Sequence, residues 1–151
     1  PDRKGTFGGY YPVSAVLSNQ AVLGLLKPGQ HGSTFGGNPL ACAVAIKALD
    51  VLIKEKMVEN SQDMGEYFLS ALKTIDSPIV KEIRGKGLMI AIELDTESGV
   101  VGRQISEKLL AKGLLCKETH THTIRFAPPL IIQKEEVDYC VDLIANVINA
   151  F

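Results

Sequence analysis

The sequence predicts an α/β protein, and its larger C-terminal part predicts a small α+β sandwich with helices packed on one sheet. From Asn60 onward, segments with helical and strand periodicity follow one another in the order α-β-β-α-β-β-α. The chain is 46% hydrophobic and 22% charged, which are ordinary values for a globular protein. Its 151 residues correspond to about one domain.

The first third of the chain combines turn-forming residues with one long apolar segment. Residues 10–18 are aromatic and β-branched, which predicts a strand, and residues 20–26 predict a short helix. Asn38 and Pro39 indicate a helix start, because Asn accepts hydrogen bonds at the N-cap and Pro suits the first turn. The helix predicted over residues 40–53 is apolar on nearly every side, so we expect it to be buried.

The rest of the chain is divided by apolar periodicity and by glycine or proline turns. A Gly-Lys-Gly turn at residues 85–87 separates two strand patterns, and Gly113 suits the end of a helix. In chain order the predicted elements are a helix over 60–75, strands over 79–84 and 88–94, a helix over 101–112, strands over 114–117 and 123–127, and a C-terminal helix with Glu135 and Glu136 in its first turn.

Charge and cysteine content narrow the class of protein. With 16 basic and 17 acidic residues, the chain lacks the clustered Lys and Arg of a nucleic-acid or membrane surface, so neither partner is expected. No apolar run is long enough for a bilayer span, and no signal-peptide pattern opens the chain. Cys42, Cys116 and Cys140 lie far apart among apolar neighbours, which predicts reduced core thiols in a cytoplasmic protein. The abrupt start, without Met, suggests a fragment of a longer protein.

The glycine-rich loop HGSTFGGNPL, residues 31–40, is the first candidate binding element. Glycines expose backbone N–H groups, and the hydroxyls of Ser33 and Thr34 can add hydrogen bonds to phosphate oxygens. The alternative is that the glycines only allow a sharp turn before a buried helix. Spacing alone does not decide between the two.

Three further positions carry possible chemistry. In TIRFAPPL, Arg125 ends a strand before a stiff Pro-Pro turn and can offer its planar fork to a carboxylate; a solvated arginine is the alternative. His120 and His122 share a strand face, but no third metal ligand is positioned, so we predict a solvated hairpin tip and no metal. Lys4, shortly before Gly8-Gly9, is a candidate nucleophile or simply a charged residue.

Taken together, several segments resemble the C-terminal part of the class III aminotransferases. They are GGYYPVSAVL, KPGQHGSTFGGNPLACAVAIKALDVL, IRGKGLMIAIEL, GLLCKETH and IRFAPPLII, in this order along nearly the whole chain. The resemblance implies a fold-type I enzyme that uses pyridoxal 5'-phosphate and acts as a homodimer with sites at the subunit interface. It also implies that residues 1–57 end the large domain and its connecting helix, and that residues 58–151 form a small domain with an antiparallel sheet covered by helices.

The resemblance further assigns residue roles and a reaction. It implies transfer of the δ-amino group of ornithine to 2-oxoglutarate, with Lys4 as the catalytic, cofactor-bearing lysine. Ser33 and Thr34 fall on the cofactor-phosphate contact, where the threonine reaches the partner subunit's cofactor, and Arg125 falls on the arginine that binds a substrate carboxylate. Residues 2–7 depart from the family's pattern around its lysine.

Other cofactor contacts of the family precede Lys4, so we expect the isolated chain to hold the cofactor poorly and to be inactive. The alternatives are a class III aminotransferase acting on acetylornithine or 4-aminobutyrate, and a non-catalytic α+β module that binds an anion or a protein.

Overall fold

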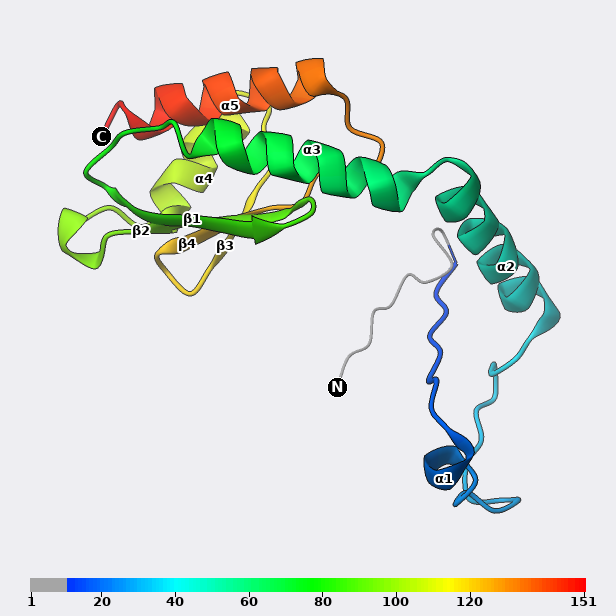
Figure 1. The fold of residues 1–151 in the computed structure, drawn as a ribbon. Helices are drawn as coiled ribbons and strands as arrows, with labels where there is room; N and C mark the ends of the chain where they lie inside the picture. The colour runs from blue at the N-terminus through cyan, green and yellow to red at the C-terminus, as the bar shows by residue number, and fades with distance from the viewer. Residues whose placement is uncertain (1–10) are drawn as a thin grey trace. The chain divides into compact units, whose positions relative to one another are not determined.

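The structure, a computed structural model, describes residues 11–151, and the chain divides into two compact units, Pro1–Glu55 and Lys56–Phe151 (Figure 1). We call them unit 1 and unit 2. Unit 1 contains the helices α1 (Gln20–Leu23) and α2 (Pro39–Lys54). The strand predicted over 10–18 is wrong in its described part, where only Tyr11 and Val13 form isolated bridges. A strand needs a neighbouring strand for its backbone hydrogen bonds, and none lies beside this segment within the described residues.

Asparagine residues cap the starts of α1 and α2, as the sequence predicts for α2. The Asn38 side chain accepts a hydrogen bond from the Ala41 backbone N–H at 2.9 Å, and Pro39 occupies the first turn. Asn19 caps α1 in the same way, accepting from the Val22 N–H at 3.1 Å.

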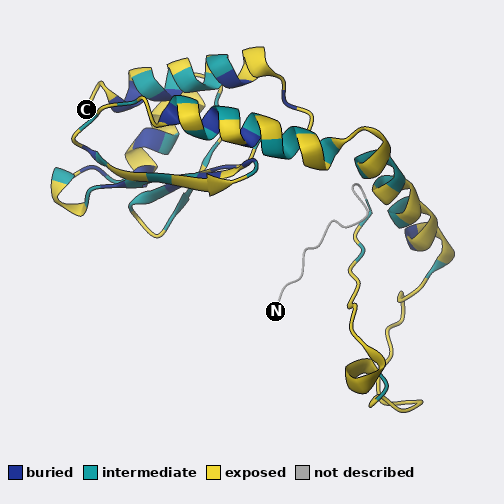
Figure 2. Ribbon diagram, in the orientation of Figure 1, coloured by how far each residue is buried: buried dark blue, intermediate teal, exposed yellow. Residues whose placement is uncertain are grey.

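The α2 helix is largely exposed in this chain, and its burial by other parts of a longer protein stays a prediction. Figure 2 shows α2 drawn mostly as exposed or intermediate. Of its residues only Ala41 is buried, whereas Leu40, Ile46 and Ile53 are 59%, 66% and 73% exposed. Cys42 is exposed as well, so it is not a core thiol. The reason is that the described part of unit 1 contains no second layer to cover these side chains.

Unit 2 is a four-stranded antiparallel sheet with three helices on one face, which confirms the predicted α+β sandwich (Figure 1). The strand order is β1-β2-β4-β3, and α3, α4 and α5 contact the sheet or one another. The elements are α3 (Met57–Leu72), β1 (Val80–Lys86), β2 (Met89–Leu94), a 3₁₀ turn η1 (Thr96–Ser98), α4 (Gly102–Ala111), β3 (Lys117–Thr119), β4 (Thr123–Phe126) and α5 (Lys134–Ile148).

The core of unit 2 lies between the helices and the sheet. The alternation predicted for the second strand is confirmed, since Leu88, Ile90, Ile92 and Leu94 are at most 4% exposed. They pack with other apolar residues of the three helices and of β4, among them Phe68, Leu72, Ile105, Leu109, Ile124, Phe126, Val137, Ile144 and Ile148. Within unit 2 the opposite face of the sheet carries no helix and remains open.

Local hydrogen bonds shift three of the predicted boundaries. The turn that closes α4 extends to Leu114, because the Leu114 N–H donates a hydrogen bond to the Leu109 carbonyl at 2.9 Å and is not available to a strand. As a result, β3 begins at Lys117 rather than at residue 114. The strand β1 runs through Lys86, and the turn to β2 is short, with Gly87 at a φ of 53°. The helix α3 begins at Met57, three residues before the predicted start.

Candidate functional site

Arg125 lies on the open face of the sheet, where its position follows from strand alternation. Its neighbours Ile124 and Phe126 are 0% and 4% exposed and anchor β4 in the core. Arg125 itself is exposed and therefore points away from the helices. The strand fixes the backbone of Arg125 while its guanidinium group stays accessible to a ligand.

A row of residues crosses the open face at the level of Arg125. Strand register pairs Arg84 with Ala91, Ala91 with Arg125, and Arg125 with Lys117. Directly opposed residues of antiparallel strands share a face, so these four side chains lie on the open side of the sheet. The small Ala91 leaves space beside Arg125, and Lys117 flanks it on the other strand.

An ion-pair cluster occupies the β1 and β2 part of the same face. Lys81 Nζ lies 3.0 Å from a carboxylate oxygen of Glu93, and Arg84 contacts both Glu93 and Glu82. Hydrogen bonds from Lys81 and then from Arg84 hold the pKa of Glu93 below its usual range. The hydrogen bond to Glu93 in turn raises the pKa of Lys81 and of Arg84. All three groups are therefore charged at neutral pH.

The predicted phosphate loop lies in unit 1, immediately before α2. Ser33 and Thr34 are both exposed, and a cavity of about 430 Å³ beside the loop includes Ser33 in its lining. Gly37, with a φ of 69°, supplies the left-handed backbone that turns the loop into the Asn38 cap.

The donors of this loop fit the chemistry of a phosphate group. Within residues 11–151, the hydroxyls of Ser33 and Thr34 form no hydrogen bond, and neither do the backbone N–H groups from Gly32 to Phe35. Two free hydroxyls next to free amides form a donor set that suits phosphate oxygens.

The predicted site residues are not all brought together by the structure. Lys4 lies outside the described residues. Ser33 and Thr34 belong to unit 1 and Arg125 belongs to unit 2, so a pocket shared by Thr34 and Arg125 stays a prediction.

The histidine pair lies in the loop between β3 and β4, and this loop is held by its backbone. His120 and Thr121 have φ values of 52° and 58°, and the Thr121 carbonyl accepts a hydrogen bond from the Gly102 N–H at 2.7 Å. Among residues 11–151, no group of three or more His, Cys, Asp or Glu side chains is arranged to hold a metal.

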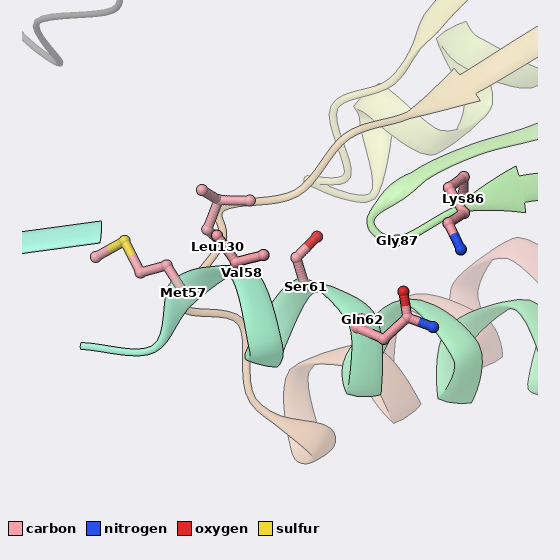
Figure 3. Close-up of a pocket in the computed structure, with 7 residues that line it drawn as sticks. All are labelled: Met57, Val58, Ser61, Gln62, Lys86, Gly87 and Leu130. Carbon is pink, nitrogen blue, oxygen red and sulfur yellow. The ribbon is translucent and has the colours of Figure 1, made fainter. Parts of the chain in front are cut away.

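Two other hollows in unit 2 contain none of the predicted site residues. A cavity of about 290 Å³ lies between the first turns of α3, the β1–β2 turn and Leu130. Figure 3 shows the side chains that line it. The Ser61 hydroxyl in its wall accepts a hydrogen bond from the Leu88 N–H at 3.3 Å, so it already has a structural partner. The larger hollow, about 980 Å³, is mainly apolar and lies beside the Pro128-Pro129 turn and α5.

The sequence profile described as "Aminotransferase class-III" matches residues 3–148. Since this match spans nearly the whole chain, the chain belongs to the class III aminotransferase family. The fold-type I assignment and the expected family resemblance are thereby confirmed.

Curated relatives of this chain are aminotransferases of the same kind. An "Ornithine aminotransferase" of Brevibacillus brevis is 53% identical over 146 residues, 97% of this chain and 36% of the relative. One from Bacillus subtilis is 52% identical over 97% of this chain and 35% of its own length. The chain thus spans about a third of the curated relatives that it matches.

Solved structures resemble this chain closely. The Plasmodium falciparum ornithine delta-aminotransferase has a TM-score of 0.89 at 46% identity, covering 95% of this chain and 37% of that chain. An acetylornithine aminotransferase from Elizabethkingia anophelis has a TM-score of 0.85 at 44% identity, covering 96% of this chain and 39% of that chain.

The structure adds one neighbour of Arg125 that the sequence analysis did not single out. Lys117 lies directly opposite Arg125. Lys117 is identified by the register of the β3–β4 hairpin. Thr119 is paired with Thr123, so the residues two positions further from the loop on each strand, Lys117 and Arg125, are paired as well. Within residues 11–151, none of the helices combines the length and apolarity needed to cross a membrane.

Proposed function

We propose that this chain forms part of a pyridoxal 5'-phosphate-dependent aminotransferase that transfers the δ-amino group of ornithine to 2-oxoglutarate, giving glutamate semialdehyde and glutamate. The observation that carries the proposal is the 53% identity, over 97% of this chain, to a relative named ornithine aminotransferase. Membership of the class III family supports the same reaction type.

In this proposal the loop before α2 holds the cofactor phosphate. Ser33 and Thr34 supply the hydroxyl donors, and the free N–H groups beside them add further hydrogen bonds. When bound, the cofactor supplies an electron sink for the proton transfers of transamination. The proposed role of Lys4 is to carry the cofactor and move the proton.

Arg125 would bind a carboxylate of the substrate and set its orientation. Its guanidinium can form two parallel hydrogen bonds to one carboxylate, which fixes direction as well as affinity. The buried side chains of Ile124 and Phe126 hold the strand on both sides of Arg125 and limit movement of its backbone. A lysine at this position keeps the charge but loses the paired geometry.

The proposal also covers the rest of the enzyme. Residues 1–57 would end the large domain with its connecting helix, residues 58–151 would form the small domain, and two copies would form the homodimer. The exposed apolar side chains of α2, such as Ile46 and Ile53, support a covering layer from elsewhere in such an assembly. Three free cysteines support the expected cytoplasmic location.

The test is a comparison of amino donors on the enzyme that contains this chain, after incubation with the cofactor. We expect turnover with ornithine and 2-oxoglutarate, and the Arg125→Lys variant should lose at least about tenfold in kcat/KM. The Lys112→Arg variant, at an exposed position beyond α4, is the matched control and should retain activity. Absence of both turnover and a cofactor absorbance band would contradict the proposal and favour a non-catalytic binding module.

A second candidate is transamination of acetylornithine, favoured by the 44% identity to the Elizabethkingia anophelis structure. The same assay separates the two, because a higher kcat/KM for acetylornithine than for ornithine would replace the first proposal. A preference for 4-aminobutyrate would identify a third member of the family.

A further inference from the structure

The open face of the sheet in unit 2 carries two like-charge pairs at directly opposed positions. The first is Glu82 opposite Glu93. Like charges directly opposite each other destabilise a sheet unless other groups compensate them. Here the compensation is present, since Arg84 contacts both carboxylates and Lys81 contacts Glu93 as well.

The second pair is Lys117 opposite Arg125, and within residues 11–151 it has no compensation. Neither side chain takes part in any of the ion pairs there. Glu93, diagonally across from Arg125, is already held by two cations. Glu118 follows Lys117 but lies on the helix-covered face, where it contacts Arg103 at 3.3 Å.

We propose that Lys117 is a substrate-binding residue that acts with Arg125 on one carboxylate group of the dicarboxylate substrate. This inference rests on the proposed function, because it takes Arg125 as the carboxylate-binding arginine. The carboxylate supplies the negative charge that the pair lacks. Directly opposed side chains start about 5 Å apart at Cβ, so one carboxylate can accept hydrogen bonds from both.

The two cations contribute differently to this site. The planar fork of Arg125 orients the carboxylate, and the flexible Lys117 ammonium adds a point charge beside it. Lys117 therefore contributes to affinity for the substrate more than to the rate of the chemical step. Its effect is expected in KM for 2-oxoglutarate, with a smaller effect on kcat.

The test uses the cofactor-loaded enzyme that contains this chain, with 2-oxoglutarate as the probe. We expect Lys117→Gln to raise KM for 2-oxoglutarate about tenfold, the factor of one hydrogen bond to a charged group. Lys117→Arg should restore most of this loss. Lys112→Gln, an exposed lysine beyond the end of α4, is the control and should leave KM unchanged.

Thermal unfolding separates binding from a structural role. Removal of one of two opposed like charges should leave the Tm of Lys117→Gln unchanged or slightly higher. A lower Tm with unchanged KM would assign Lys117 a structural role and overturn the inference. If Lys117→Gln leaves KM unchanged while Arg125→Gln raises it, the inference fails and the proposed function stands. If neither variant changes KM, the carboxylate role of Arg125 fails too.

Discussion

The close packing of α3 against the β1–β2 turn at Gly65 predicts that Gly65→Ala destabilises the protein. Gly65 is buried in the middle of α3, beside the β1–β2 turn. A Cβ atom at this position would overlap the carbonyl group of Gly87 and lie 2.6 Å from the Gly87 Cα. The obstacle is backbone rather than a flexible side chain, so either the helix or the turn must move.

The expected size follows from two opposing effects. Alanine gains about 1 kcal/mol of helix propensity over glycine. Overpacking in a close-packed interior costs about 1–3 kcal/mol, and contact with backbone favours the upper end of this range. We therefore expect Gly65→Ala to lower the free energy of unfolding by about 2 kcal/mol, or Tm by about 10 °C for a unit of this size.

Urea unfolding followed by circular dichroism measures this change. Asp63→Ala, at an exposed position of the same helix, is the matched control and should stay within about 0.5 kcal/mol of the parent. A Gly65→Ala protein as stable as the parent would refute the close approach of α3 to the turn.

Three further measurements test other parts of the structure. Thr121→Gly should stabilise the protein by about 1 kcal/mol in urea unfolding, because a β-branched residue is strained at a φ of 58°; a loss of stability would contradict this. Hydrogen bonds from Lys134 and Tyr67 hold the pKa of Asp138 below its usual range, so their stabilisation is present above about pH 4 and is lost as pH falls through the lowered pKa. In the Asp138→Asn variant, the free energy of unfolding should therefore fall less steeply with decreasing pH in this acid range. An unchanged slope would refute the assignment. In the isolated chain, mass spectrometry after limited iodoacetamide treatment should find Cys42 alkylated first. Cys42 is exposed, whereas burial raises the pKa of the Cys116 and Cys140 thiols. Simultaneous labelling of all three cysteines would contradict this.

Local chemistry explains which elements the sequence predicts well. The Asn38 cap depends only on residues within one turn, and the alternation over 88–94 depends only on which face is apolar, so both follow from sequence. The strand over 10–18 depends on a partner strand, and the burial of α2 depends on a covering layer. Neither is a property of the segment itself, so propensity alone determines neither of them.

The same distinction applies to the candidate site. The exposure of Arg125 follows from its place between Ile124 and Phe126, which a strand pattern reveals. Its neighbour Lys117 follows only from the register between β3 and β4, which depends on how the hairpin loop folds. That loop includes His120 in a left-handed backbone conformation, which cannot be predicted from its residue type.

Strand alternation in β4 separates the groups that hold the fold from the group that would bind substrate. Ile124 and Phe126 pack against the helices, whereas Arg125 lies on the open face with no ion pair among residues 11–151. Because Arg125 adds little to the core and lies opposite a like charge, its removal should not weaken folding. An exposed cation kept beside another cation is unfavourable for the sheet alone. A bound carboxylate would offset the repulsion between the two cations. The charges of Lys117 and Arg125 therefore favour a role in substrate binding over a role in the stability of the fold.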